Sequence, residues 1–193
     1  MAAAALERVE PDRNERILDA VLRLLADQGI AGVSMRAVAR EAGVALGLVN
    51  YYFEDKHHLI CAALRRIDAL DAALVEPDAN LEPKPRLQAA LRRVAAAEYM
   101  QADYLMLRVQ VWSLAHVHED FAAINSAAHD RYRDGLARLL RAAQPQLPAA
   151  ECRRRAVDID LLQNGMWLSA FLGSDRPSIR RAVARTEEIA FAP

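Results

Sequence analysis

The positions of proline constrain the fold of this chain more than any other feature of its sequence. One group of prolines falls within residues 75–85, Pro145 and Pro148 form a second group, and Pro177 follows near the end. The segments between these groups are rich in alanine, leucine and arginine, which favour helices. Because proline ends or interrupts a helix, this pattern predicts an all-α protein with a non-helical connection over residues 75–85.

The composition is that of an ordinary globular protein. Of the 193 residues, 53% are hydrophobic and 26% are charged, and the formal net charge is −1. No apolar stretch reaches the roughly 18 residues that a membrane span needs, and residues 1–6 lack the basic start of a secretory signal. We therefore expect a cytoplasmic protein that does not associate with membranes.

No group of side chains has the spacing of a catalytic, cofactor or metal site. Cys61 and Cys152 lie far apart and make no redox motif or disulfide framework. His116, His118 and His129 do not have the spacing of zinc ligands, and no carboxylate completes the set. The sequence therefore predicts a protein that is not an enzyme and that has no cofactor.

The N-terminal segment has the pattern of three short helices. The first is expected to begin after its N-cap Asp12 and to end at Gly29. Its apolar face consists of Ile17, Val21, Leu24 and Leu25. Ser34 is the expected N-cap of the second helix, and Leu46–Tyr52 is the third. Gly43 lies where the chain reverses between these two, and we expect it to have a positive φ. Together they form the pattern of a helix-turn-helix.

These residues resemble the DNA-binding domain of the tetracycline-repressor (TetR) family. The resemblance rests on Gly29, Ser34–Val44, Gly47–Lys56 and Leu59. Members of this family are all-α chains that pair this domain with a divergent C-terminal domain. The resemblance therefore implies a helix-turn-helix domain over residues 1–54, a connecting helix over residues 55–75, and a ligand-binding and dimerisation domain over residues 76–193.

The resemblance also implies that the third helix reads DNA. Asn50 is the only amide on this helix and is able to pair with adenine, whereas Leu46 and Leu48 reach only thymine methyl groups. Tyr51 and Tyr52 are expected to contact phosphates, which position the protein without reading sequence. The predicted DNA-binding residues are Ser34, Arg36, Ala45, Leu46, Gly47, Leu48, Asn50, Tyr51, Tyr52 and Lys56.

The charge of the N-terminal part argues against tight DNA binding. Residues 1–67 contain nine basic and nine acidic side chains, whereas strong phosphate binders are basic. Arg36, Arg40 and Lys56 still form a local basic surface if the acidic residues face elsewhere. We therefore expect modest affinity and a shallow dependence on salt. The alternative function is that of a helical interaction protein of the same fold that has lost operator binding.

Apolar residues at helical spacing predict a bundle of five helices in the C-terminal part. Segments within residues 131–141 and 164–168 are similar to the C-terminal domain of betaine-inhibitor repressors. The resemblance implies a homodimer through the last two helices. Its interface would contain Trp167, Leu168, Phe171, Leu172, Ile179, Val183 and Ile189. A symmetric dimer suits a palindromic operator.

Polar and aromatic residues on two helices of this bundle predict a pocket for a small-molecule effector. The predicted ligand-binding residues are Tyr99, Trp112, His116, Tyr132, Asp160, Gln163, Asn164 and Trp167. By resemblance, Tyr99, Tyr104, Trp112, Tyr132 and Trp167 would form an aromatic cage for a quaternary ammonium ion. The same residue types at helical spacing also occur in ordinary cores, so the effector stays open. The sequence as a whole predicts a dimeric repressor that a small molecule releases from operator DNA.

Overall fold

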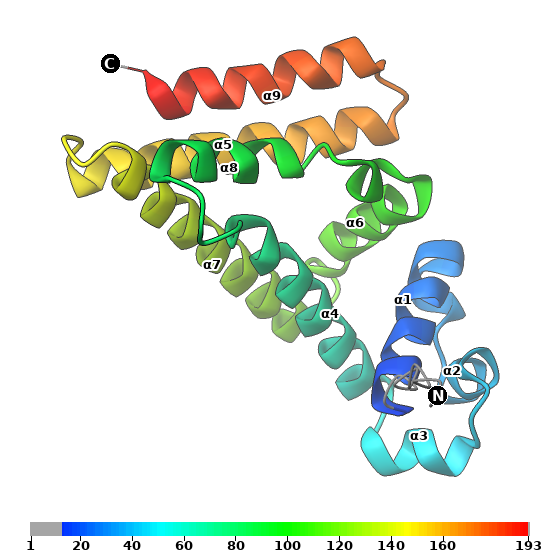
Figure 1. Ribbon diagram of the computed structural model, residues 1–193. Coiled ribbons are helices and arrows are strands. Elements are labelled where there is room, and N and C mark those ends of the chain that lie inside the picture. The colour runs from blue at the N-terminus through cyan, green and yellow to red at the C-terminus, as the bar shows by residue number, and fades with distance from the viewer. Residues whose placement is uncertain (1–12, 193) are drawn as a thin grey trace, which may run out of the picture. The chain divides into compact units, whose positions relative to one another are not determined.

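The structure, a computed structural model, describes residues 13–192 (Figure 1). Within this range the regular elements are α-helices and short 3-10 helices without strands, which confirms the predicted all-α fold. The chain forms two compact units, one up to Ala63 and one from Leu64 onward, and helix α4 (Lys56–Ala72) runs through the boundary. Between residues 13 and 192, no helix is long and apolar enough to cross a membrane.

Three helices and the start of α4 form the first unit. They are α1 (Arg13–Gly32), α2 (Met35–Ala42) and α3 (Leu46–Tyr52). Gly29 has non-helical dihedral angles (φ 64°, ψ −167°), so the first helical segment ends there as expected, and a short second segment that is counted with α1 runs on to Gly32. Glycine accepts this conformation without the steric cost of a Cβ, so the chain bends there and the helix resumes. Asp12, the expected N-cap, lies outside the described residues.

The apolar face of α1 lies at the centre of a small core. Ile17, Val21, Leu24 and Leu25 are buried, as their spacing predicts. The other elements contribute Val38, Ala39, Val49, Phe53, Leu59 and Ile60. Val49 is the buried residue of α3, so this helix presents a single face to the core. The remaining faces of α3 are therefore exposed or half-buried.

The turn between α2 and α3 depends on a capping hydroxyl at one end of α2 and a glycine at the other. Ser34 caps α2 as predicted, because its Oγ accepts a hydrogen bond of 3.1 Å from the Ala37 N–H. Gly43 is left-handed (φ 65°, ψ 39°), which confirms the expected positive φ, and its N–H donates to the Arg40 carbonyl. The Val44 N–H donates to the Ala39 carbonyl at 3.0 Å, which completes a Schellman motif.

We expect Gly43→Ala to lower the free energy of unfolding by about 1–2 kcal/mol, because a Cβ is strained in the left-handed conformation. Urea denaturation followed by circular dichroism measures this change. Gly47→Ala is the matched control, since Gly47 is helical and a Cβ there meets open space. The control is expected to stabilise the protein by about 0.5–1 kcal/mol. Equal stabilities of the two variants would contradict the left-handed turn.

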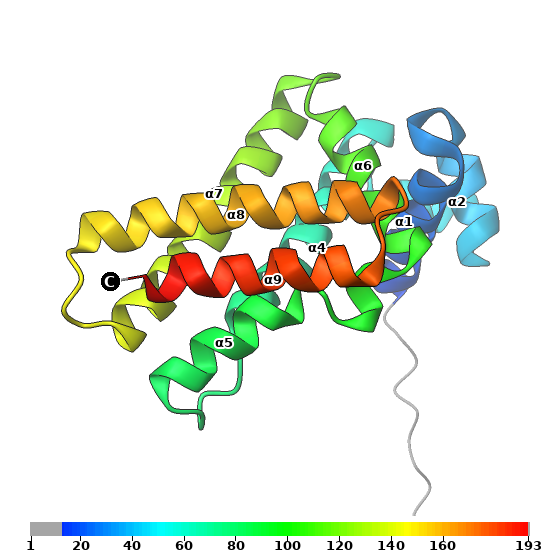
Figure 2. The same ribbon diagram turned by 90° about the horizontal axis from the view of Figure 1, so that it is seen from above.

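Five longer helices follow α4 in the described part of the second unit (Figures 1 and 2). They are α5 (Pro83–Arg93), α6 (Ala102–Leu114), α7 (Glu119–Ala143), α8 (Ala149–Phe171) and α9 (Arg176–Phe191), with 3-10 helices at Ala73–Val75 and Ala97–Met100. The expected non-helical connection over residues 75–85 is shorter, because α5 already begins at Pro83. Proline suits the first turn of a helix, where its missing N–H would have no intrahelical acceptor.

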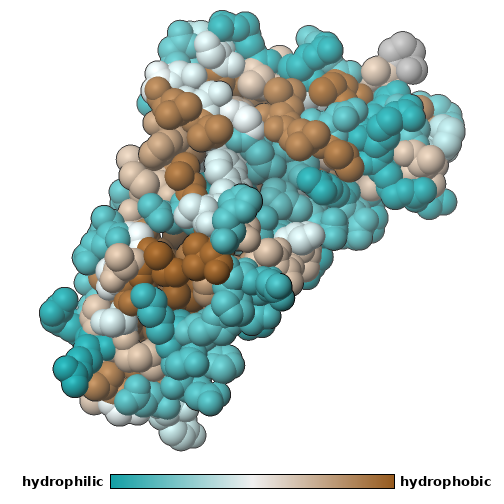
Figure 3. Space-filling model, turned by 180° about the vertical axis from the view of Figure 1, so that it is seen from behind, coloured by the Kyte–Doolittle hydropathy of each residue, from teal (hydrophilic) through white to brown (hydrophobic). Residues whose placement is uncertain are grey.

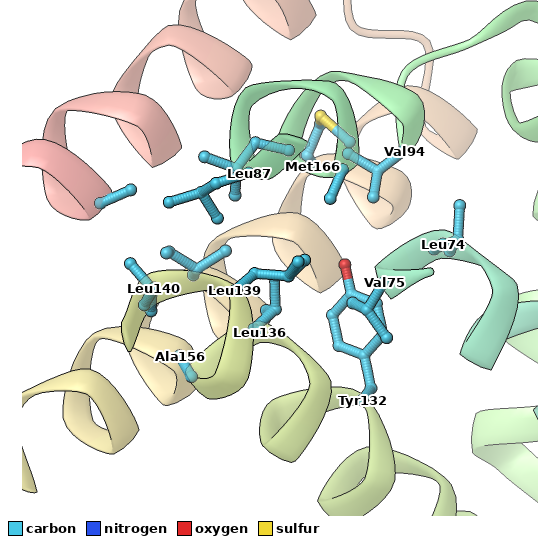
Figure 4. Packing of buried hydrophobic residues seen from close by; sticks show 14 of the residues in the cluster. Leu74, Val75, Leu87, Val94, Tyr132, Leu136, Leu139, Leu140, Ala156 and Met166 are labelled. Atoms are coloured by element: carbon cyan, nitrogen blue, oxygen red, sulfur yellow. The ribbon is translucent and has the colours of Figure 1, made fainter. Parts of the chain in front are cut away.

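The core of the second unit lies between α5, α7 and α8 (Figure 4). Leu87 of α5, Leu136 and Leu140 of α7 and Met166 of α8 point toward one another there. α7 packs along α8, and α9 packs against α8 and α5, so these elements form one continuous bundle. A fold of this kind leaves side chains of α4, α6, α7 and α8 to surround an internal cavity, described below.

Candidate DNA-binding surface and ligand cavity

The exposed face of α3 carries the predicted base-reading residues. Asn50 is exposed, and Tyr51 has 81% of its surface exposed, while Tyr52 has 40%. The two rings are in edge contact, with centroids 5.3 Å apart. Ala45 precedes the helix without a side-chain cap, as its methyl group dictates, and Gly47 adds no side chain to the exposed face. Leu46 and Leu48 are half-buried. The exposed face of α3 thus presents the amide of Asn50, the phenol groups of Tyr51 and Tyr52, and the backbone at Gly47.

Basic residues of α2 and α1 divide into exposed and engaged groups. Arg36 and Arg40 on α2 are exposed, and neither makes an ion pair with the described residues. Arg16 and Arg23 of α1 are used within the fold: the Arg16 guanidinium donates to the Ala42 carbonyl at 2.8 Å, and Arg23 pairs with Glu41. Some basic side chains of this region are therefore engaged within the fold, whereas Arg36 and Arg40 are exposed and available for phosphates.

Lys56 has a role inside the fold that its sequence context does not indicate. Its Nζ donates a hydrogen bond of 2.6 Å to the Ile30 carbonyl, so it fastens the start of α4 to the end of α1. The carboxylate of Asp55 accepts a hydrogen bond from the His58 N–H at 2.8 Å, and this bond holds the pKa of Asp55 below its ordinary value. A negative side chain thus already occupies the N-terminus of α4, while Lys56 keeps two further N–H groups.

The second unit contains a small, partly open cavity between α4, α6, α7 and α8. Its walls are formed by Leu64, Ile67, Asp68, Asp71, Leu74, Arg108, Val111, Ile124, Asn125, Ala128, His129, Tyr132, Asp160 and Trp167. The volume is about 30 Å³, enough for one or two water molecules and too small for an organic ligand. An effector of ordinary size therefore enters only if side chains of the wall move.

The charged side chains of this cavity are joined in ion pairs. Arg108 pairs with Asp71, and both side chains are almost fully buried. The Tyr104 hydroxyl also donates to Asp71, at 3.2 Å. Burial raises the pKa of the Asp71 carboxyl, and the Arg108 guanidinium opposes this effect. Arginine stays protonated in proteins, so the guanidinium is a permanent charge in the wall. Asp68 pairs with Arg131, whose side chain is about half exposed.

Asp160 of α8 is the centre of a second group. The Arg133 Nε donates to its carboxylate at 2.7 Å, and His129 Nδ1 lies 3.2 Å from the same oxygen. The Asn164 amide donates to the other oxygen at 2.7 Å. Burial alone would raise the pKa of Asp160, but the hydrogen bonds and charges of His129 and Arg133 outweigh it and lower that pKa. The carboxylate is therefore ionised and fully used by its neighbours.

The guanidinium of Arg108 lies between two tryptophan rings. Its Cζ is 4.8 Å from the ring centroid of Trp167 and 5.5 Å from that of Trp112, the range of cation–π contacts. Arg108 also donates to Asn164 at 3.4 Å, which links it to the Asp160 group. The aromatic faces that a bound cation would use are thus occupied by a side chain of the protein.

The structure brings together some of the predicted ligand-binding residues. Tyr132, Asp160 and Trp167 line the cavity, and Trp112, Gln163 and Asn164 contact lining residues. Tyr99 is in edge contact with the ring of Tyr104 and does not line the cavity. His116 was expected on the same helix face as Trp112, and this prediction was wrong. α6 ends at Leu114, so His116 lies exposed in the following turn, and α7 begins after its N-cap His118.

Four charged or titratable cavity residues were not predicted from the sequence, namely Asp68, Asp71, Arg108 and His129, and neither was Arg133, which pairs with the lining residue Asp160. A signal for two of them is visible in hindsight. Asp71 and Arg108 lie on the apolar stripes of α4 and α6, where a charged residue is costly unless it is paired.

Trp167 was expected in the dimer interface as well as in the pocket, but it is buried in its own bundle, where its Nε1 donates to the Val94 carbonyl at 3.0 Å. Ile179 is buried too.

Two family models match the chain. Residues 17–63 match the model of bacterial regulatory proteins of the tetR family, and residues 83–190 match the C-terminal model of BetI-type transcriptional repressors. The HTH-type transcriptional regulator BetI of Rhizobium meliloti is 30% identical over 182 residues, which cover 93% of this chain and 88% of that protein. The match therefore extends over both units.

Solved structures agree with the all-α fold. A transcriptional regulator from Pseudomonas aeruginosa PAO1 has a TM-score of 0.81 at 24% identity, with 96% of this chain and 92% of that chain covered. A regulator from Saccharomonospora viridis, solved in complex with choline, has a TM-score of 0.72 at 22% identity, with 95% and 98% covered. Through these matches, and through the helix-turn-helix that the first unit forms, the chain belongs to the TetR family of DNA-binding transcriptional regulators and carries a BetI-type C-terminal domain.

Proposed function

We propose that this regulator is a repressor that binds a palindromic operator as a homodimer and is released by a small molecule. The observation that carries the proposal is the exposed face of α3, which presents Asn50 and Tyr51, together with the exposed Arg36 and Arg40 of α2. An amide reads a base edge, and phenols and guanidinium groups hold phosphates. Few basic groups take part, so affinity should fall only gently with salt.

A mobility-shift titration against the intergenic DNA upstream of its own gene tests this proposal, at two salt concentrations. Tyr51→Ala is the informative variant, because the ring of Tyr51 is 81% exposed and its loss leaves the core intact. A specific shift that weakens in Tyr51→Ala supports the proposal. If neither this DNA nor a random-sequence selection yields a bound site, the chain is an interaction protein that has lost its operator.

A stripe on α8 supports the homodimer. Val157, Leu161, Leu168 and Leu172 are exposed by 37–73% and share one face of the helix. Gly165 lies exposed at the edge of this stripe, and a Cβ added there would meet no atom. Glycine weakens a helix, so its presence here is not explained by packing within the chain. Figure 3 looks at the side on which α8 lies, and hydrophobic groups run in patches across the upper part of that view. A second copy of α8 would cover this stripe, and the two helices could approach closely where Gly165 has no side chain.

The release mechanism that we propose depends on α4. This helix contributes Asp68 and Asp71 to the cavity wall, and at its other end Lys56 is bonded to Ile30 of the first unit. The cavity is too small for an organic effector, so an effector would bind a conformation in which the wall has opened. Binding to that conformation would shift α4 and change the spacing of the two α3 helices in the dimer.

Gly47→Ala is expected to weaken operator binding by about tenfold without harming the fold. The added methyl group meets no protein atom, so any loss of affinity arises where α3 approaches DNA. The apparent Kd in the mobility-shift assay measures the effect, and the urea midpoint confirms that folding is intact. Unchanged affinity would show that this part of α3 does not approach the DNA closely.

A further inference from the structure

The buried polar atoms that lack a partner in the described part of the second unit are all hydrogen-bond donors. They are Arg86 Nε, Arg108 Nε and Gln163 Nε2. Two of these belong to the cavity region: Arg108 lines it, and Gln163 accepts a hydrogen bond from the lining residue Tyr132 at 2.7 Å. Their residues are only 5% and 1% exposed. A buried donor without an acceptor is costly, so a molecule that completes this site brings an acceptor.

The cavity offers little to a cation. Its three carboxylates, Asp68, Asp71 and Asp160, are each paired with an arginine. The rings of Trp112 and Trp167 already hold the guanidinium of Arg108. A second cation at these rings would lie next to a charge that is never lost, and like charges in a buried site repel strongly. The site therefore already contains its own cation.

Much of the remaining wall is apolar. Leu64, Ile67, Leu74, Val111, Ile124 and Ala128 form this apolar part, while Asn125, His129 and the Tyr132 hydroxyl add polar groups. Such a wall favours a hydrocarbon body, because burying apolar surface gives about 25 cal/mol per Å². Apolar walls and an unpaired Arg108 Nε–H together describe a ligand with a hydrocarbon part and an anionic acceptor at one end.

We propose that the effector is a small apolar carboxylic acid that binds when the wall of this cavity opens. Its carboxylate accepts a hydrogen bond from Arg108 Nε, and its body lies against Ile67, Val111 and Ile124. The ion pair between Arg108 and Asp71 stays in place, since the guanidinium has donors for both carboxylates. This inference rests on the proposed function, because it assigns a ligand class to the cavity of a ligand-responsive regulator.

The tryptophans provide a direct test. Trp112 and Trp167 are the two tryptophans of the chain, and both contact Arg108, so tryptophan emission reports on this site. The full-length protein is titrated with phenylacetate and hexanoate, and with the cations benzyltrimethylammonium, hexyltrimethylammonium and choline. We expect saturable changes with the two acids, and none with the three cations.

Three variants locate the binding site. Arg108→Lys keeps the charge but lacks Nε, so acid binding is expected to weaken by about tenfold or more. Arg108→Gln leaves the tryptophan faces and Asp71 without their cation, so this variant is expected to lose acid binding and to gain binding of the quaternary ammonium probes. Arg92→Gln is the matched control, because Arg92 lies away from the cavity in an exposed ion pair with Glu187. This variant should bind the acids as the natural protein does and should bind none of the cations. Circular dichroism verifies that each variant is folded.

The results separate this inference from the proposed function. Three results would each overturn the inference. The first is cation binding by the natural protein, and the second is acid binding that Arg108→Lys leaves unchanged. The third is no response to either acid at about 10 mM, a concentration on the order of the weakest dissociation constants that a useful effector has. The mobility-shift assay is independent of these titrations. A protein that binds acid through Arg108 but never binds DNA would overturn the proposed function alone, and a DNA-binding protein that ignores the acids would overturn the ligand class alone.

Discussion

Leu161→Glu combined with Leu168→Glu is expected to convert the proposed homodimer into a monomer and to reduce operator affinity by about 100-fold or more. Both leucines belong to the exposed stripe on α8. In a dimer across this stripe, the two glutamates of each copy would face their counterparts in an apolar interface, where unpaired charges cost several kcal/mol. A monomer contacts a single half-site, so it loses half of the phosphate and base contacts.

Sedimentation velocity and the mobility-shift assay measure these two effects on the same samples. The control is Ser126→Glu combined with Ala142→Glu, which adds the same charges at exposed positions of α7. This control should remain dimeric and bind DNA as the natural protein does. A dimer that survives both glutamates on α8 would show that the copies meet through another surface.

Asp71→Leu is expected to lower the free energy of unfolding by about 3–5 kcal/mol, because it leaves the Arg108 guanidinium buried without its counter-charge. Adding Arg108→Met should recover most of this loss, since a buried ion pair and two apolar side chains of similar volume have similar net stability. Urea denaturation of the two variants beside the natural protein measures both numbers.

Glu187→Ala is the control for the second experiment. It removes the partner of Arg92 in an exposed pair, where solvent screening leaves only a small expected change in stability. If Asp71→Leu is no more destabilising than this control, Arg108 finds another partner or reaches water. If the double variant is as unstable as the single one, the loss comes from packing at position 71 and not from the unpaired charge.

The sequence predicts those elements whose ends are determined by local chemistry. The observed bounds of α3 are the predicted ones, because the hydroxyl of Ser34, the left-handed Gly43 and the buried Val49 fix the helix-turn-helix within twenty residues. Prolines mark the gap between α7 and α8 equally well. Pro83 is the exception, since proline is compatible with the first turn of a helix as well as with a loop.

The cavity could be predicted only in part, because its pairs join residues that are distant in the chain. Asp160, Asn164 and Trp167 share a helix face, and this periodicity is visible in the sequence. The pairing of Asp71 with Arg108 joins α4 to α6, and no local pattern records it. The aromatic cage expected from the family resemblance stays a prediction, and no local sequence pattern indicates that the guanidinium of Arg108 lies over the rings of Trp112 and Trp167.

Arg108 also makes this protein a convenient starting point for laboratory evolution. The guanidinium of Arg108 lies over both tryptophan rings, so a change in this one codon would remove the cation that the chain itself places there. A library randomised at position 108 would sample regulators with new chemical preferences while α3 and the α8 stripe keep their natural residues. Genetic selection on a reporter gene would then sort these regulators by the compounds that switch them.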